Sequence, residues 1–246
     1  MIQIKNPVPC PPVSNAPLAG LDAWGSRTLS DHQYAAVIFD FGGVITASPF
    51  EAFNRLEDER GLPQDFIRSV NAANPHDNAW AKFERAEIDA RTFDVLFEAE
   101  AEALGHPLEG RAVLAVLSGS IRPAMVRALD QLGEAGYRLA CITNNVPAGH
   151  GAGMARSGDA KDVYEQVFAR FEAVIESSKA GVRKPDPRIY EMMCETLRLA
   201  PARCVYLDDL GINCKPAATL GMAAIKVTSG EQALADLSAL LGLELG

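Results

Sequence analysis

Apolar residues in this chain form short runs separated by longer segments with helical spacing. The runs typical of buried strands lie at residues 35–40, 137–142, 172–175, 203–207 and 223–227. Helical patterns separate the later runs, including one near residues 214–220. Repeated helix–strand units predict a parallel sheet covered by helices. We therefore expect an α/β fold, with a Rossmann-like parallel sheet core and helices on both of its faces.

The segment after the first strand has a different pattern. Its start, Ser48-Pro49-Phe50-Glu51, combines an N-cap, a first-turn proline and a capping-box glutamate. This predicts a helix that begins there and ends near Gly61. From Leu62 to about Ser118 the spacing stays helical, and no run in it is typical of a strand.

The clearest helix of this segment is expected over residues 89–104. Its buried face should hold Phe93, Leu96, Phe97 and, later, Leu104. Trp80 and Phe83, earlier in the same segment, are interpreted as packing residues.

The helical segment is far longer than an ordinary connection between a strand and a helix. We interpret residues 49–118 as an all-helical cap inserted after the first strand, a lid that excludes water from the crevice. The core would then comprise residues 34–48 and 119–246. Residues 1–33, with five prolines, are expected to form an irregular arm, and residues 147–158 a glycine-rich surface loop.

Composition narrows the possible partners. The formal net charge is -9, with no basic cluster, which argues against nucleic acid because phosphate backbones are held mainly by Lys and Arg. There is no apolar stretch long enough to span a membrane and no signal-peptide pattern, so a cytoplasmic location is expected. The five cysteines include no CxxC pair, so neither a disulfide nor a metal role is expected for them. Nothing in the sequence indicates an oligomeric state.

Polar residues follow the apolar runs. Asp40 comes directly after Val-Ile-Phe, Thr143-Asn144 after the second run, and Asp208-Asp209 after Cys-Val-Tyr-Leu. Lys184 precedes a helix that Asp186-Pro187 is expected to cap. Because the carboxyl ends of parallel strands meet at one edge of the sheet, these groups should converge there. An acid in that position can be a nucleophile, a metal ligand or both.

Three aspartates in one pocket would repel one another unless a cation joined them. Oxygen ligands favour a hard ion, and Mg²⁺ is the usual partner of phosphate substrates, so we expect Mg²⁺ and a small phosphorylated substrate. Two neighbours have plainer interpretations: Asn145 as a turn residue and Arg183 as a solvated side chain.

Together these segments resemble the haloacid dehalogenase-like superfamily. The forms DFGGV, IESS…GVRKPDPRIY and LDDLGIN are similar to the amino-terminal phosphatase branch found in epoxide hydrolases. The resemblance spans about residues 35–228, with all four motifs in order and the helical segment in the expected place.

The resemblance implies roles for the residues that match. Asp40 would attack phosphorus to give an aspartyl-phosphate, and Thr143 and Lys184 would bind the transferring phosphoryl oxygens. Lys184 would also reduce the repulsion between Asp40 and the phosphate. Asn144 and Gly43 are the positions expected to contact the substrate.

The resemblance also implies the metal ligands. Asp40, the backbone carbonyl of Gly42 and Asp209 would hold Mg²⁺, with Asp208 bound to it directly or through water.

One position departs from the family pattern. Most phosphatases of the superfamily have a second aspartate two residues after the nucleophile, where this chain has Gly42. That side chain protonates the leaving oxygen and later activates water, a contribution of about 10²–10⁴-fold. A substrate with a good leaving group, or a cap acid such as Glu84 or Glu87, would compensate.

Several functions remain open at this stage. The first is a Mg²⁺-dependent phosphatase. A hydrolytic dehalogenase would use Asp40 on carbon and needs no metal, so the pair Asp208-Asp209 counts against it. A phosphomutase depends on the acid that Gly42 replaces. A binding or regulatory protein would keep the pocket without turnover.

Overall fold

The computed structural model describes residues 33–117, 119–146 and 158–246. The arm expected at residues 1–33 lies outside these residues except for Gln33. The glycine-rich loop expected at 147–158 also lies outside them, except for Gly158.

The core is a parallel sheet, which confirms the expected fold class. Its five strands in the described ranges are β1 (Ala36–Phe39), β2 (Arg138–Thr143), β3 (Ala173–Glu176), β4 (Cys204–Asp208) and β5 (Ala223–Lys226). They lie in the order β3-β2-β1-β4-β5, and every neighbouring pair is parallel. Strand β1 is therefore central, with β2 on one side and β4 on the other.

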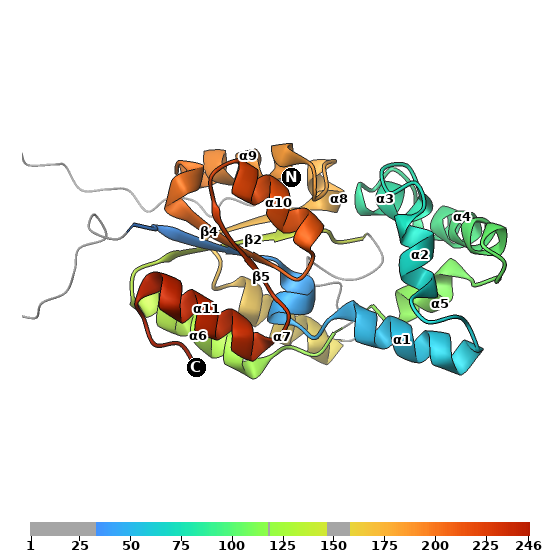
Figure 1. Ribbon diagram of the computed structural model, residues 1–246, viewed down its shortest axis with the longest axis horizontal. Helices are drawn as coiled ribbons and strands as arrows, with labels where there is room; N and C mark the ends of the chain where they lie inside the picture. The colour runs from blue at the N-terminus through green and yellow to red at the C-terminus, as the bar shows by residue number, and fades with distance from the viewer. Residues whose placement is uncertain (1–32, 118, 147–157) are drawn as a thin grey trace, which may run out of the picture.

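Alternate side chains of the strands pack into two separate apolar cores. Val37 and Phe39 of β1 face a cluster formed with α6 (Pro123–Glu134), α7 (Gly158–Phe168) and α11 (Gly230–Leu241). Ala36 and Ile38 face the opposite cluster, formed with α9 (Pro187–Leu197) and α10 (Gly211–Thr219). Figure 1 shows these two helix layers on opposite faces of the sheet. Burial on both faces explains why the strands appear in the sequence as continuous apolar runs.

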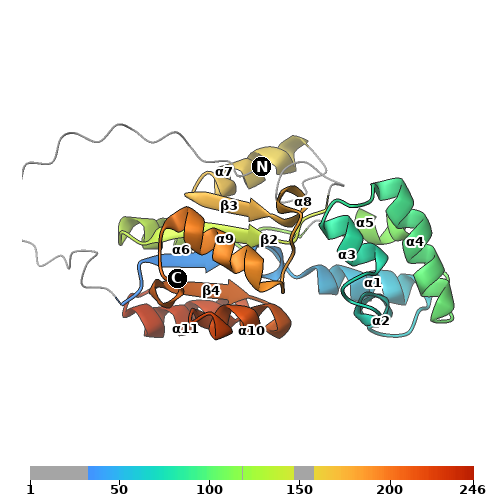
Figure 2. The same ribbon diagram turned by 90° about the horizontal axis from the view of Figure 1, so that it is seen from above.

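Five helices lie between β1 and α6 within the described residues, and we call residues 49–117 the cap. They are α1 (Pro49–Arg60), α2 (Phe66–Ala72), α3 (Ala79–Glu84), α4 (Ala90–Ala103) and α5 (Gly110–Ala115). Their apolar side chains form a third cluster, with Phe53, Phe83, Phe93 and Phe97 buried. Figures 1 and 2 show the cap beyond the carboxyl ends of the strands, beside the edge where Asp40 follows β1.

The chain passes between core and cap at two adjacent crossings. The segment after η1 (Phe41–Ile45) leaves the core, and the segment before α6 returns to it. Thr46 and Ile121 form an antiparallel bridge between the two crossings. The Ala47 N–H donates to the Ser120 carbonyl at 2.8 Å, and Arg122 N–H donates to the Ile45 carbonyl at 2.9 Å. These bonds fix the base of the cap against the core.

The predicted helix start at Ser48 is confirmed. Helix α1 begins at Pro49, the Ser48 hydroxyl accepts a hydrogen bond from the Phe50 N–H, and Gly61 ends the helix with φ 65°. The expected face of α4 is wrong in part: Leu96 is 37% and Leu104 46% exposed. The buried stripe is instead Phe93, Phe97 and Ala101, which share one face because they are four residues apart.

Two smaller features differ from the sequence prediction. The expected helix near 214–220 begins earlier, at Gly211, and includes Pro216. A short helix, α8 (Ser177–Ala180), follows β3 directly and was not predicted. No helix within the described ranges is long and apolar enough to cross a lipid bilayer.

Candidate active site

Asp40 lies at the carboxyl end of the central strand. Its N–H donates to the Leu207 carbonyl at 2.8 Å, which continues the β1–β4 pairing by one residue. Its Oδ1 accepts from the Phe41 N–H at 2.6 Å and from the Lys184 ammonium at 2.7 Å. Its Oδ2 accepts no hydrogen bond from the described part of the chain. One oxygen of Asp40 is thus held in place and the other is free to react.

Lys184 is buried and lies between two carboxylates. Its ammonium contacts Asp40 Oδ1 at 2.7 Å, Asp208 Oδ2 at 2.8 Å and the Ile142 carbonyl at 3.1 Å. Burial alone would lower the pKa of Lys184, but Asp208 and Asp40 raise it above its usual value, so the side chain is charged. An ammonium has three donors, and all three are used here. Binding of a phosphoryl oxygen by Lys184 would require one of these bonds to be exchanged.

The two acids after β4 have different surroundings. Asp208 is fully buried: Oδ1 accepts from the Leu210 N–H and the Asn213 amide, and Oδ2 from Lys184 and the Tyr206 hydroxyl. Asp209 is less buried, and its Oδ2 accepts only from the Ser48 hydroxyl, at 3.3 Å, among the described residues. Asp208 is therefore saturated with protein donors, whereas Asp209 keeps free acceptor positions.

The three aspartates form a site that suits a hard cation. Asp40, Asp208 and Asp209 each offer a carboxylate oxygen, and these oxygens lie within 4.8 Å of one another. A single ammonium, that of Lys184, balances three carboxylates. Burial, together with the charge of Asp208, raises the pKa of Asp209 to about 6, so the cluster lacks positive charge. A set of donors that are all oxygens fits Mg²⁺.

The two glycines after Asp40 have opposite constraints. Gly43 has φ +76°, and a Cβ on it would lie 2.1 Å from Asp209 Oδ2, so no side chain fits there. Gly42 has φ -69° and ψ 131°, and a Cβ on it would meet nothing within 4 Å. Position 42 therefore has room for a Cβ, whereas position 43 has none.

Thr143 and Asn144 follow β2 at the same edge. The Thr143 side chain is buried, lines the pocket and makes no hydrogen bond to any described residue, so its hydroxyl is available to a ligand. The Asn144 amide forms two bonds with the backbone of Lys184: its Oδ1 accepts from the N–H at 2.9 Å, and its Nδ2 donates to the carbonyl at 3.0 Å. Asn144 thus holds the segment that bears Lys184.

The interpretation of Asn145 as a turn residue misses its main contacts. Asn145 is buried, and its Nδ2 donates to Glu176 Oε1 at 2.9 Å. Its Oδ1 accepts from the N–H and the hydroxyl of Ser178, at 3.2 Å and 2.8 Å. Asn145 therefore joins the end of β2 to the end of β3 and to α8. An isolated Asn gives no sequence signal for such long-range bonds.

The expectation that Arg183 is solvated is wrong. Its guanidinium forms an ion pair with Glu84 of the cap and donates to the Pro75 carbonyl at 3.2 Å. Glu84 is buried, and its carboxylate also accepts from Trp80 Nε1 at 2.8 Å and from Asn144 Nδ2 at 3.3 Å. The Ser177 hydroxyl donates to the Glu84 carbonyl at 2.7 Å. One cap residue thus contacts three separate core segments.

The other cap residues that the sequence analysis named differ in their position relative to the pocket. Phe83 is fully buried in the cap, as expected for a packing residue, whereas Trp80 lines the pocket. Glu87 is exposed, forms an ion pair with Arg85 and does not line the pocket. Of the two cap acids named from the sequence, only Glu84 reaches the site.

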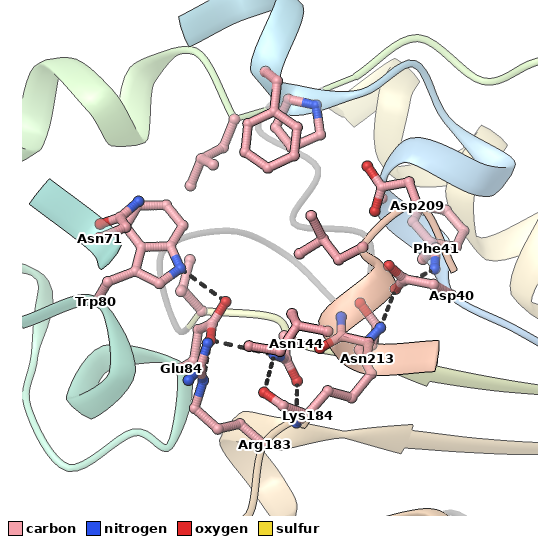
Figure 3. Close-up of a pocket in the computed structure, with 18 of the residues that line it drawn as sticks. Asp40, Phe41, Asn71, Trp80, Glu84, Asn144, Arg183, Lys184, Asp209 and Asn213 are labelled. Atoms are coloured by element: carbon pink, nitrogen blue, oxygen red, sulfur yellow. Dashed lines mark hydrogen bonds and ion pairs between the residues drawn. The ribbon is translucent and has the colours of Figure 1, made fainter. Parts of the chain in front are cut away.

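These groups line a cavity of about 590 Å³ between cap and core. In Figure 3, Asp40 and Asp209 lie on one side, Trp80 and Glu84 on the other, with Asn144 and Lys184 between them. The remaining walls are largely apolar, formed by Pro49, Phe50, Phe53, Leu117, Val146, Leu210 and Ile212. We call these apolar walls the apolar end of the cavity, although Arg68, Asn71, His76 and Asn78 of the cap also line the cavity.

Two of the curated relatives are much longer than this chain, which spans less than half of their length. It is 33% identical over 217 residues to mouse acyl-CoA dehydrogenase family member 10, covering 86% of this chain and 20% of that protein. It is 30% identical over 221 residues to pig bifunctional epoxide hydrolase 2, covering 85% of this chain and 39% of that protein. The match to sesquiterpene phosphatase astK of Aspergillus oryzae, at 25% identity, covers 85% of this chain and 97% of that protein.

Solved structures have the same fold. An enzyme of Bacteroides thetaiotaomicron in complex with magnesium and inorganic phosphate matches 80% of this chain and 96% of its own, with a TM-score of 0.52 and 18% identity. L-2-haloacid dehalogenase of Xanthobacter autotrophicus matches 84% of this chain and 82% of its own, with a TM-score of 0.55 and 18% identity. The family model of haloacid dehalogenase-like hydrolases matches residues 34–221. The chain therefore belongs to the haloacid dehalogenase-like hydrolases.

Proposed function

We propose that this hydrolase is a Mg²⁺-dependent phosphatase that acts on a small phosphorylated metabolite through an aspartyl-phosphate on Asp40. The observation that supports the proposal is the charge of the site: three carboxylates, two of them buried, meet one lysine beside a free oxygen of Asp40. A divalent cation balances that charge, and phosphoryl transfer depends mainly on positioning and charge neutralisation.

The reaction begins at Asp40. Lys184 and the Phe41 N–H hold Oδ1, so the free Oδ2 attacks phosphorus while the bond from phosphorus to the leaving oxygen breaks. The Thr143 hydroxyl is free to donate to a phosphoryl oxygen, and Asn144 keeps the Lys184 segment in place. Gly43 leaves room for Asp209 beside the substrate. Water then attacks the aspartyl-phosphate, which releases phosphate and restores Asp40.

Asp40, Asp209 and the Gly42 carbonyl are the groups that would hold Mg²⁺. When bound, the cation neutralises charge on the phosphoryl oxygens. Because protein donors occupy both oxygens of Asp208, its role is to orient Lys184 and to contact the cation through water.

The apolar end of the cavity favours a substrate with an apolar body. Phe50, Phe53, Trp80, Leu117 and Ile212 line it, and burial of apolar ligand surface stabilises binding by about 25 cal/mol per Å². A sugar phosphate would lose the hydration of its hydroxyls against these apolar walls, and only the few polar cap side chains in the lining, such as Arg68 and Asn71, would offer replacement partners. The name of one relative, a sesquiterpene phosphatase, agrees with this substrate class.

The alternatives predict different behaviour. A dehalogenase acting on carbon needs no metal, so Lys184 alone would have to balance the charge of Asp40, Asp208 and Asp209. A binding or regulatory protein would take up Mg²⁺ and a phosphorylated ligand without turnover, because Gly42 provides no acid.

The test is phosphate release from a panel of monophosphate esters, with Mg²⁺ and with chelator. The panel contains a sesquiterpenyl monophosphate, alkyl phosphates of increasing length and a hexose phosphate. We expect release that requires both Mg²⁺ and Asp40, with kcat/KM highest for the apolar esters. Asp40→Asn should abolish release, and Asp236→Asn, which changes an exposed aspartate of α11, should not.

Release that persists in Asp40→Asn or in chelator would contradict the proposed mechanism. Binding of Mg²⁺ with no release from any ester would support the binding-protein alternative instead. Preference for the hexose phosphate would contradict the proposed substrate class alone.

A further inference from the structure

The proposed phosphatase reaction, on which this inference rests, requires a proton donor that position 42 cannot provide. An alkoxide leaves phosphorus slowly unless a proton reaches it, and the attacking water must later lose a proton. Gly42 has no side chain, and the space beside it is open. Some other group at the pocket must hold and return that proton.

The titratable groups that line the pocket are few within the described residues. The carboxylates are Asp40, Asp209 and Glu84, and the first two belong to the nucleophile and cation site. The Tyr164 hydroxyl donates to the Gly119 carbonyl, and His76 is exposed. Glu84 is therefore the one pocket carboxylate, among the residues described, that the nucleophile and cation site leave unused.

The geometry of an in-line reaction selects the same residue. The leaving oxygen departs on the side of phosphorus opposite to the attacking oxygen. Figure 3 shows Glu84 across the pocket from Asp40, on the cap wall. Asn144, the neighbour of Thr143, connects the core side of the pocket to Glu84, because its Nδ2 lies 3.3 Å from Glu84 Oε2. Glu84 thus lies on the side to which the leaving group points.

The surroundings of Glu84 permit both protonation states. Burial raises the pKa of Glu84 above its usual value, while the charge of Arg183, the Trp80 hydrogen bond and the charge of Lys184 lower it. Trp80 Nε1 donates to Oε1, and Arg183 and Asn144 donate to Oε2, so these donors hold the carboxylate after it gives up a proton. Binding of a phosphate dianion nearby favours the protonated form.

We propose that Glu84 performs the acid–base role for which the family uses the side chain at position 42. In the first step Asp40 Oδ2 forms its bond to phosphorus, the ester bond breaks, and the Glu84 proton passes to the leaving oxygen. In the second step the Glu84 carboxylate takes a proton from the attacking water as the new oxygen–phosphorus bond forms and the aspartyl bond breaks. Both atoms and charge are balanced, and Glu84 ends protonated as it began.

The test compares two leaving groups in Glu84→Gln, which keeps the size of the side chain. Single-turnover release of the alcohol or phenol, with enzyme in excess, isolates the first step. A primary alkyl phosphate needs a proton on its leaving oxygen, and its release should slow by about 10²–10⁴-fold. Release of 4-nitrophenol, which leaves as the anion, should change by less than about threefold.

Two matched variants complete the design. Glu87→Gln, at an exposed cap carboxylate, should leave both rates unchanged. Adding Gly42→Asp to Glu84→Gln should restore much of the alkyl rate, because it returns the acid of the family pattern at a position where a Cβ meets nothing within 4 Å. If Glu84→Gln does not fold, Glu84→Asp replaces it, with a smaller loss expected for the alkyl ester alone.

Equal slowing of both leaving groups would overturn the inference and would leave Glu84 as a residue that only holds the cap to Arg183 and Asn144. An unchanged alkyl rate would overturn it as well. Failure of the proposed function is a different result, because the unmodified protein would then release no phosphate, or Asp40→Asn would release as much as the unmodified protein.

Discussion

Gly43 has a positive φ, and a Cβ on it would clash with Asp209, so the proposed cation site leaves no room for a side chain there. We predict that Gly43→Ala lowers the free energy of unfolding by about 1–2 kcal/mol, because φ +76° is unfavourable for a residue with a Cβ. Displacement of Asp209 should also weaken Mg²⁺ binding by about 10–100-fold. Urea unfolding and calorimetric Mg²⁺ titration measure the two effects.

Gly42→Ala is the matched control, since it adds the same methyl group at φ -69° in open space. It should bind Mg²⁺ as the unmodified protein does. Equal Mg²⁺ affinity in Gly43→Ala would mean that Asp209 does not hold the cation.

Protonation of Asp209 should control the binding of Mg²⁺. Its pKa is raised to about 6 by burial and by Asp208, so the folded protein holds this proton more tightly than the unfolded chain does. The metal-free protein should therefore lose stability as the pH rises from about 4 to about 6, and Mg²⁺ should reverse the loss. Mg²⁺ affinity should fall as the pH decreases below about 6, because the cation must displace the proton.

Urea unfolding at about pH 4.5 and about pH 6.5, with and without Mg²⁺, measures this dependence. Asp209→Asn should reduce it, and the part that remains should come from Asp40 and Glu84, whose pKa values are also raised by burial. If the stability of the metal-free protein did not change over this interval, the assigned pKa of Asp209 would be wrong.

At the scale of the elements, Asn145 links two strand ends, although the sequence suggested only a turn residue. It joins the ends of β2 and β3 through Glu176 and Ser178. Asn145→Ala leaves buried polar partners without hydrogen bonds, so the free energy of unfolding should fall by about 1–3 kcal/mol. Ser178→Ala removes one hydroxyl that is only partly buried, and its effect should be smaller, as urea denaturation can measure. A loss in Asn145→Ala no larger than in Ser178→Ala would indicate a turn residue.

For the molecule as a whole, the position of the cap determines the character of the cavity. Ile212 lies in the first turn of α10, is 57% exposed and lines the apolar end. Ile212→Asn should lower kcat/KM for a sesquiterpenyl monophosphate by about tenfold and leave that for acetyl phosphate unchanged, because only the larger substrate reaches this wall. Val163→Asn is the control, as an exposed apolar residue of α7 outside the cavity. Equal losses of kcat/KM for both substrates would mean that the apolar part of the larger substrate does not bind at Ile212.

The sheet and the residues at its edge could be predicted from the sequence. The strands β1, β2 and β4 are buried on both faces, so each appears as a continuous apolar run, and the polar residue that ends the run marks the edge. Asp40, Thr143 and Asp208 were found in this way, since each lies at or next to the end of its strand. Gly42 was recognised as a departure through the resemblance to the family, whose pattern places an aspartate two residues after the position of Asp40.

The sequence could not show which of these groups keep free hydrogen-bonding positions, or which cap residue contacts them. Both depend on the tertiary structure. Lys184 donates its three hydrogen bonds to Asp40, Asp208 and the Ile142 carbonyl. The Asn144 amide forms hydrogen bonds with the backbone of Lys184. Glu84 and Arg183, 99 positions apart, form an ion pair across the junction of cap and core. Such contacts depend on how the cap packs against the core, and the local spacing of residues along the chain does not indicate that packing.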